Sequence, residues 1–236
     1  MVGDSPRRVL DLGSGRGQLA RMLADAGHRV HCMDRSAERV RRIGERIPTG
    51  MHVVAQAEAL PFADQSFDVV SSAESLHRFA PGLAAPEIAR VLRPGGRLVA
   101  IYNTRDDTVP WVKKLARILQ DVDPQAMRGD FGQGSVEAMA ETPYFTDLQR
   151  RNFRNWLPID RPALLDMVGQ RPATLELDDT SRTALLAEVG ELYDTYARAP
   201  EPLLLPFQAS CWRAGVDHRE LALTGADDGL EIPLGF

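Results

Sequence analysis

The chain has 236 residues, of which 44% are hydrophobic and 26% are charged, a composition typical of a globular protein rather than a disordered one. The net charge of −5 and a pI near 5.6 argue against nucleic-acid binding, which usually requires a basic surface. No stretch approaches the roughly 18 apolar residues of a membrane span, and the N-terminus lacks the apolar core of a signal peptide. We therefore expect a cytoplasmic protein without membrane contacts.

The lone cysteines Cys32 and Cys211 lack the spacing of a metal or redox site, and we expect no metal.

The first part of the chain alternates short apolar runs, typical of strands, with segments of helical periodicity. Strands are predicted at 8–12, 30–33, 52–57, 67–71 and 97–102. Helices are predicted at 18–26, from Ser36 as the capping residue to Pro48, and before Pro94-Gly95-Gly96. Strands separated by helices at this spacing predict a parallel, doubly wound α/β sheet.

The rhythm changes after residue 103. Helices are predicted from Pro110, at 162–170 and at 181–197, and strands at 148–157 and 203–212. Residues 121–142 contain three glycines without clear periodicity and are interpreted as a loop with at most short helical turns. We expect residues 1–103 to form the cofactor-binding half of one domain, 104–213 its substrate-side half, and 214–236 a tail.

Three alternate glycines, Gly13, Gly15 and Gly17, follow the first predicted strand and open the first predicted helix. Glycine allows positive φ and lets the backbone approach a ligand closely. Their GxGxG spacing differs from the GxGxxG pattern that holds a dinucleotide pyrophosphate, although a plain strand-to-helix turn also uses glycines. Asp34 ends the second predicted strand, where its carboxylate can accept hydrogen bonds from a ribose or else cap a helix. The loop and Asp34 together indicate an adenosine-bearing ligand.

Four ordered stretches of the sequence resemble the class I S-adenosylmethionine-dependent methyltransferases. They are Val9-Leu10-Asp11-Leu12-Gly13-Ser14-Gly15-Arg16-Gly17, Ala57-Glu58-Ala59-Leu60-Pro61-Phe62, Ser66-Phe67-Asp68-Val69-Val70 and Arg90-Val91-Leu92-Arg93-Pro94-Gly95-Gly96-Arg97-Leu98. The resemblance implies a Rossmann-like sheet of seven strands with helices on both faces and the last strand antiparallel. Later stretches at 102–106, 109–112, 205–207 and 211–213 are similar to a narrower bacterial branch, the trans-aconitate-methyltransferase-like proteins.

The resemblance also implies S-adenosyl-L-methionine as the cofactor and assigns residues to it. Asp11 would lie near the methionine amino group, Asp34 would hold the ribose, and the backbone of Ala57 would contact adenine. The remaining cofactor-binding residues implied in this way are Gly13, Gly15, Gly17, Arg35, Gln56, Glu58 and Ser72.

Methyl transfer is an in-line displacement, for which the protein must hold a nucleophile roughly 3 Å from the methyl carbon. A base is needed only where the acceptor loses a proton, and His77 and Glu74 are the candidates, ahead of Tyr102. Relatives tend to have Gln-x-x-His-Trp where this chain has residues 74–78, so its preference for a small-molecule acceptor can differ from theirs. Arg105 could clamp an acceptor carboxylate, or else pair with a nearby aspartate. Trp111 is expected either in the core or in the wall of the acceptor pocket.

Only Met1–Arg7 precede the first predicted strand, whereas relatives place a covering helix there. We therefore expect the 121–142 segment, the tail or a second subunit of a homodimer to cover the cofactor. Two other functions remain open. A catalytically degenerate fold-mate would bind the cofactor product without transferring a methyl group, and a nicotinamide oxidoreductase is disfavoured by the GxGxG spacing.

Overall fold

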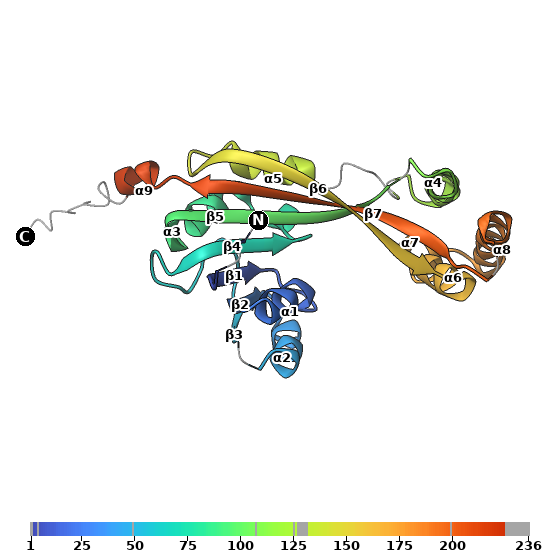
Figure 1. Ribbon diagram of the computed structural model, residues 1–236, viewed down its shortest axis with the longest axis horizontal. Coiled ribbons are helices and arrows are strands. Elements are labelled where there is room, and N and C mark those ends of the chain that lie inside the picture. The colour runs from blue at the N-terminus through green and yellow to red at the C-terminus, as the bar shows by residue number, and fades with distance from the viewer. Residues whose placement is uncertain are drawn as a thin grey trace, which may run out of the picture. The chain divides into compact units, whose positions relative to one another are not determined.

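The structure of the protein, a computed structural model, describes residues 2–3, 5–48, 50–106, 108–124, 126, 132–198 and 200–224, without the side chains of 104, 105 and 222–224. Its strands form one seven-stranded sheet of order β3-β2-β1-β4-β5-β7-β6 (Figure 1). Their bounds are β1 Arg8–Leu12, β2 Arg29–Asp34, β3 Met51–Val54, β4 Phe67–Ala73, β5 Leu92–Arg105, β6 Phe145–Ile159 and β7 Leu203–Val216. The predicted α/β sheet, with its last strands antiparallel, is confirmed.

Helices follow most of these strands along the chain, although the described residues between β3 and β4 contain none. They are α1 Gln18–Asp25, α2 Ala37–Arg46, the 3-10 turn η1 Leu76–Arg78, α3 Pro81–Val91, α4 Pro110–Val122, α5 Gln133–Ala140, α6 Arg161–Gly169, α7 Pro172–Leu175, α8 Asp179–Tyr196 and α9 Arg219–Thr224. Ser36 caps α2 as predicted, because its side chain accepts a hydrogen bond from the backbone N–H of Arg39.

The first four strands pair in parallel, so their carboxyl ends meet at one edge of the sheet. Successive residues of each strand point to opposite faces of the sheet. On β1, Val9 packs in a cluster with α1 and α2, while Leu10 packs in a second cluster with α3 and α5. Helices therefore cover both faces of this part of the sheet, as the resemblance implied.

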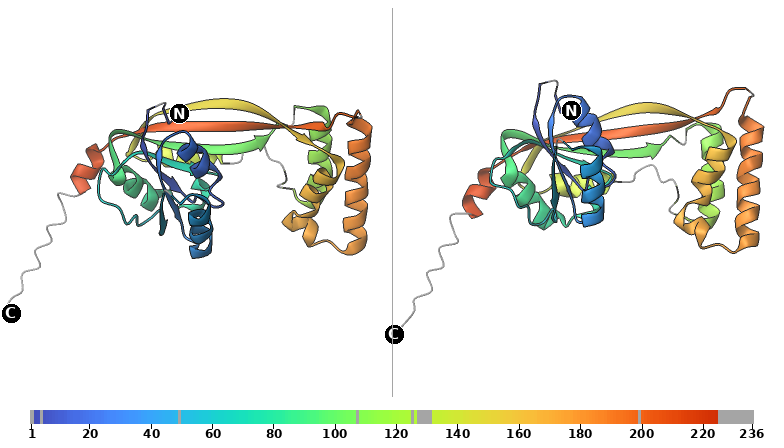
Figure 2. Two further views of the ribbon diagram at one scale, coloured as in Figure 1. Left: turned by 60° about the horizontal axis from the view of Figure 1, so that its bottom comes forward. Right: turned by 90° about the horizontal axis from the view of Figure 1, so that it is seen from below.

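The contacts divide the chain into two compact units. The first contains residues 1–102, 132–151 and 211–236, and the second contains 103–131 and 152–210. Within the second unit, α8 lies beside α4 and α6 around an apolar core that includes Leu115, Leu164 and Val189 (Figure 2). No helix in the described ranges is long and apolar enough to cross a membrane.

The prediction of a loop over 121–142 is wrong at its end, where the structure contains α5. Gly132 precedes α5 with a φ of 86°, and Val136 and Met139 are buried one helical turn apart. The two glycines at this N-terminus obscured the short helix, because glycine disfavours helix in any propensity-based prediction. The first residues of the expected tail, 214–216, belong to β7, and the helix α9 follows them; residues 225–236 lie outside the described residues.

Replacing Gly132 with alanine should destabilise the protein, because a Cβ there would overlap the ring of Tyr102 and the positive φ disfavours any side chain. We expect a loss of about 1–3 kcal/mol in the free energy of unfolding, measured by urea denaturation. Gly134→Ala is the matched control, since nothing lies near its Cβ and alanine favours a helix by about 0.5–1 kcal/mol. An equal effect of both changes would contradict this account.

Candidate functional site

A cavity of about 270 Å³ lies in the first unit, at the carboxyl ends of the parallel strands. Strand β1 lies between β2 and β4, so the connections that follow β1 and β4 leave on opposite sides of the sheet. Such a point in an open α/β sheet leaves a crevice where ligands bind. The residues lining the cavity are Gly13, Met33, Asp34, Arg35, Arg39, Ala55, Gln56, Ala57, Glu58, Ser75, Arg78, Phe79 and Ala80.

The glycine loop borders this cavity with its backbone. Gly13 has a φ of 65°, and a Cβ at this position would come within 2.6 Å of the Cβ of Ser75. The loop is tied to β2, because the N–H of Ser14 donates to the carbonyl of Met33 at 3.0 Å. Gly13 therefore allows a close approach that another residue would block.

Asp11 lies at the end of β1 behind the loop and is almost completely buried. Its Oδ1 accepts a hydrogen bond of 2.8 Å from the hydroxyl of Ser71 on β4. Burial raises the pKa of Asp11 from 3.8 to about 6, against the opposing effect of hydrogen bonds from Ser71 and Ser14. The protein thus keeps a carboxyl group with an unusually high pKa next to the cavity.

Two further serines connect the end of β4 to the glycine loop. The hydroxyl of Ser75 donates its proton to the carbonyl of Leu12 at 2.7 Å. The hydroxyl oxygens of Ser72 and Ser75 are also 2.7 Å apart, and because the Ser75 proton is already used, Ser72 donates to Ser75. Ser72 is fully buried, whereas Ser75 lines the cavity. The structure therefore places the expected Ser72 behind Ser75.

Asp34 ends β2 and is only 3% exposed, yet its carboxylate borders the cavity. One oxygen accepts from the N–H of Gly15 at 3.1 Å and the other accepts from the N–H of Ser36 at 3.0 Å. Arg39 on α2 lies 3.7 Å from the first of these oxygens. A carboxylate has about four acceptor positions, so both oxygens can also accept from a pair of ligand hydroxyls.

The expected residues after β3 form another wall of the cavity. Gln56 and Ala57 line it, and Ala57 is buried. Glu58 also lines it, and its Oε1 accepts a hydrogen bond of 2.9 Å from the N–H of Ala80. Arg35 also lines the cavity. Gly15 and Gly17 belong to the glycine loop but do not line the cavity.

The candidate bases lie in the segment after β4. Glu74 has a positive φ of 51°, an uncommon conformation that marks strain in this segment. The phenol oxygen of Tyr102 accepts from the backbone N–H of His77 at 3.1 Å and lies 3.4 Å from its Nδ1. Partial burial and the neighbouring Arg78 lower the pKa of His77, while Glu74 opposes this shift. A neutral imidazole at physiological pH can accept a proton.

The two expected substrate residues lie in the second unit. The side chain of Arg105 is outside the described residues, at the end of β5. Trp111 on α4 is buried in the core of this unit. Asp106, the residue after Arg105, forms an ion pair of 3.2 Å with Arg154. Hydrogen bonds from Thr108 lower the pKa of the Asp106 carboxyl group.

Among the lining residues that the sequence did not point to are Arg39, Ser75, Arg78 and Phe79. Ser75, Arg78 and Phe79 follow β4, whose carboxyl end already indicated this edge of the sheet. The 3-10 turn η1, which brings them back toward the glycine loop, left no clear sequence signal. Arg39 lies in the first turn of α2, which follows directly on the predicted Asp34, and its guanidinium lies 3.7 Å from the Asp34 carboxylate.

Asp11→Asn should change how stability depends on pH. The folded pKa of about 6 lies above the ordinary 3.8, so the stability from this group is full below pH 3.8 and is lost as pH rises through 6. One pKa unit corresponds to about 1.4 kcal/mol, so ionisation at pH 8 costs the folded state about 3 kcal/mol. Between pH 4 and pH 8, the free energy of unfolding of the variant should gain up to about this amount over the wild type. Urea denaturation measures it, and a constant difference would contradict the prediction.

Comparison with known proteins identifies the family. A family described as a methyltransferase domain matches residues 10–100. An uncharacterized methyltransferase from Mycobacterium tuberculosis is 34% identical over 211 residues, which cover 88% of this chain and 83% of the relative. A demethylmenaquinone methyltransferase from Beutenbergia cavernae is 42% identical over 150 residues, which cover 63% of this chain and 59% of the relative.

A solved structure agrees with this assignment. A protein from Anaeromyxobacter dehalogenans, described as a type II methyltransferase, has a TM-score of 0.67 and is 26% identical, with 89% of each chain covered. The sheet order, the cavity beside the glycine loop and the sequence identity to these relatives all support the same family assignment. The chain belongs to the class I S-adenosylmethionine-dependent methyltransferase family.

Proposed function

We propose that the cavity binds S-adenosylmethionine and that the protein transfers the methyl group to a small-molecule acceptor. The observation that carries the proposal is the nearly buried carboxylate of Asp34 at the cavity, which suits the two hydroxyls of a ribose. The expected assignments fit the same geometry. Ala57 and Gln56 would contact the adenine, and the carboxylate of Asp11 would face the methionine ammonium across the backbone of Gly13.

When bound, the cofactor supplies an activated methyl group on a sulfonium sulfur. The protein then has to orient the two reactants and keep water out, which accounts for most of the catalysis in such a displacement. For acceptors that lose a proton, we assign the proton transfer to Nε2 of His77, because Tyr102 contacts the Nδ1 side of the ring. Glu74 lies in the same segment and is the second candidate for this role.

The class of acceptor follows from the relatives and from the charge of the chain. The Beutenbergia relative is named for demethylmenaquinone, a quinone-type small molecule. A net charge of −5 does not favour nucleic acid. We therefore propose a small organic acceptor, with quinols as the first class to test, and retain Arg105 as the candidate clamp for an acidic group on it.

Cofactor binding can be tested at Asp34. Isothermal titration calorimetry with S-adenosylhomocysteine should give saturable binding to the wild type. Asp34→Asn removes the charge that accepts the ribose hydroxyls and should weaken binding by at least tenfold, as expected for a charged hydrogen bond. Asp25→Asn, at the exposed end of α1, is the matched control and should bind as the wild type does. Absence of binding to the wild type at millimolar ligand would refute the proposal.

The proposed role of Asp11 predicts a pH dependence. Below pH 6 the carboxyl is protonated in the free protein and cannot pair with the ligand ammonium. The affinity for S-adenosylhomocysteine should therefore fall by about tenfold for each pH unit below 6 and stay level above it. In Asp11→Asn the affinity should be low and should not change with pH. Calorimetry at pH 5, 6 and 7 measures the affinities of the wild type and the variant. A wild-type affinity that does not change over this range would exclude Asp11 as the partner of the ammonium.

Catalysis can be tested with methyl-labelled cofactor and a panel of quinols, phenols, carboxylic acids and amines. Turnover with one class supports the transferase, and His77→Ala should then lower kcat with little change in the KM for the cofactor. Binding without turnover of any acceptor, including those in a cell lysate, would favour the alternative of a catalytically degenerate binding protein.

A further inference from the structure

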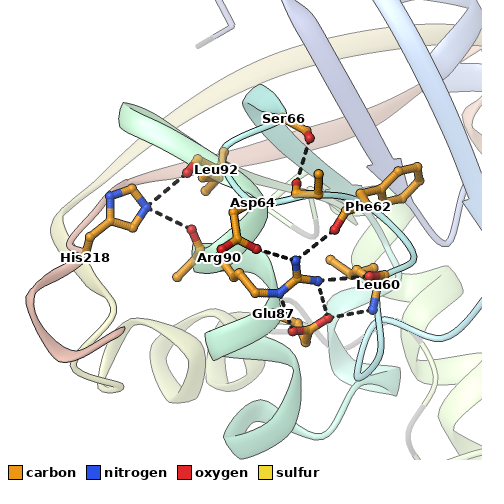
Figure 3. Close-up of polar contacts among 10 residues, drawn as sticks. Leu60, Phe62, Asp64, Ser66, Glu87, Arg90, Leu92 and His218 are labelled. Atoms are coloured by element: carbon orange, nitrogen blue, oxygen red, sulfur yellow. Dashed lines mark hydrogen bonds and ion pairs between the residues drawn. The ribbon is translucent and has the colours of Figure 1, made fainter. Parts of the chain in front are cut away.

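Arg90, near the end of α3, uses all of its side-chain donors within the first unit (Figure 3). Its Nη1 donates to the carbonyl of Phe62 and to Oδ1 of Asp64, both at 2.8 Å. Its Nη2 donates to the carbonyl of Leu60 at 2.9 Å and to Oε2 of Glu87 at 2.8 Å, and Nε donates to Oε1 of Glu87 at 2.7 Å. A guanidinium has five N–H donors, so no donor of Arg90 is left for water.

Glu87, one helical turn earlier on α3, completes this arrangement from the other side. Its Oε2 accepts the backbone N–H of Leu60 at 2.7 Å. Together Glu87 and Arg90 therefore bind both the N–H and the carbonyl of Leu60, which fixes the orientation of that part of the backbone. The hydrogen bonds from Arg90 lower the pKa of Glu87, and the Arg90 side chain is only 27% exposed.

The segment held in this way continues directly into the cavity. Leu60 follows Ala57 and Glu58, two of the lining residues, and Gln56 forms an isolated bridge with Ala59. Glu58 accepts a hydrogen bond from the N–H of Ala80, the capping residue of α3. The helix α3 thus holds this wall at two points, at its start through Glu58 and near its end through Arg90.

We propose that Arg90 is a positioning residue that sets the wall of the cofactor cavity against which the adenine lies. The inference rests on the function proposed above, because it assumes that Ala57 contacts the adenine. Arg90 itself is not among the lining residues and acts through its contacts with residues 60–64, which continue the backbone of this wall. A lysine could not replace it, because a compact ammonium cannot reproduce the planar bidentate contact with Glu87 and two separate carbonyls.

The test compares Arg90→Lys with a neighbouring arginine. In Arg90→Lys the affinity for S-adenosylhomocysteine should fall by roughly tenfold, the loss expected from one charged hydrogen-bond network. Arg93→Lys is the matched control, because Arg93 also forms an ion pair, with Asp68, and also donates to a carbonyl, that of Gln65. Its affinity should remain within about twofold of the wild type.

Adenosine separates an effect at the adenine wall from an effect on the methionine part of the site. Arg90→Lys should weaken adenosine and S-adenosylhomocysteine by the same factor, because both ligands contain the adenine. Asp11→Asn should weaken S-adenosylhomocysteine but leave adenosine unchanged, because adenosine has no ammonium group. Equal affinities of Arg90→Lys and the wild type for both ligands would overturn the proposal.

Hydrogen exchange supplies a readout that needs no ligand. The amide of Leu60 should exchange faster in Arg90→Lys and in Glu87→Gln than in the wild type, while amides of β1 keep their protection. Unchanged exchange of Leu60 would overturn the proposal even if affinity fell. A wild type that does not bind S-adenosylhomocysteine would refute the proposed function instead, so the two failures are distinguishable.

Discussion

The position of β1 in the sheet is the constraint on which the candidate site depends. Because β1 pairs with β2 on one side and β4 on the other, the connections that follow these strands diverge and leave a crevice at their carboxyl ends. The glycine loop, Asp34 and Ser75 all border the crevice from these strand ends. A break in the pairing of β1 would remove all three from the cavity at once.

The buried Asp11 and the partly buried Glu87, two ionisable groups near the cavity, are stabilised in opposite ways. The carboxyl of Asp11 has few hydrogen bonds for its burial, and its pKa is raised to about 6. The carboxyl of Glu87 accepts from Arg90 and from Leu60, and its pKa is lowered. The first arrangement leaves a charge that a cationic ligand can stabilise, whereas the second is complete within the chain. Asp11 is therefore suited to bind a ligand, whereas Glu87 is suited to hold the wall of the cavity in place.

The parts of the fold that follow from local rules could be predicted from the sequence. The first strands, the helices α1, α2 and α3, the cap at Ser36 and the glycine loop each depend on a short local pattern, whereas the 3-10 turn η1 has none. The end of the 121–142 segment could not, because α5 is stabilised by the burial of Val136 and Met139 rather than by helix propensity. The roles of Ser75 and Arg90 depend on contacts between residues far apart in the chain, and no local pattern contains them.

Every residue that lines the cavity lies between Gly13 and Ala80, and the side chains that hold its wall end at Arg90. The cavity is therefore encoded by one continuous part of the gene. A genetic exchange with its crossover after residue 93 would transfer all of the lining residues, together with Glu87 and Arg90, to a new C-terminal sequence. One such event would replace the whole second unit, including Trp111, while the residues that line the cavity are inherited unchanged.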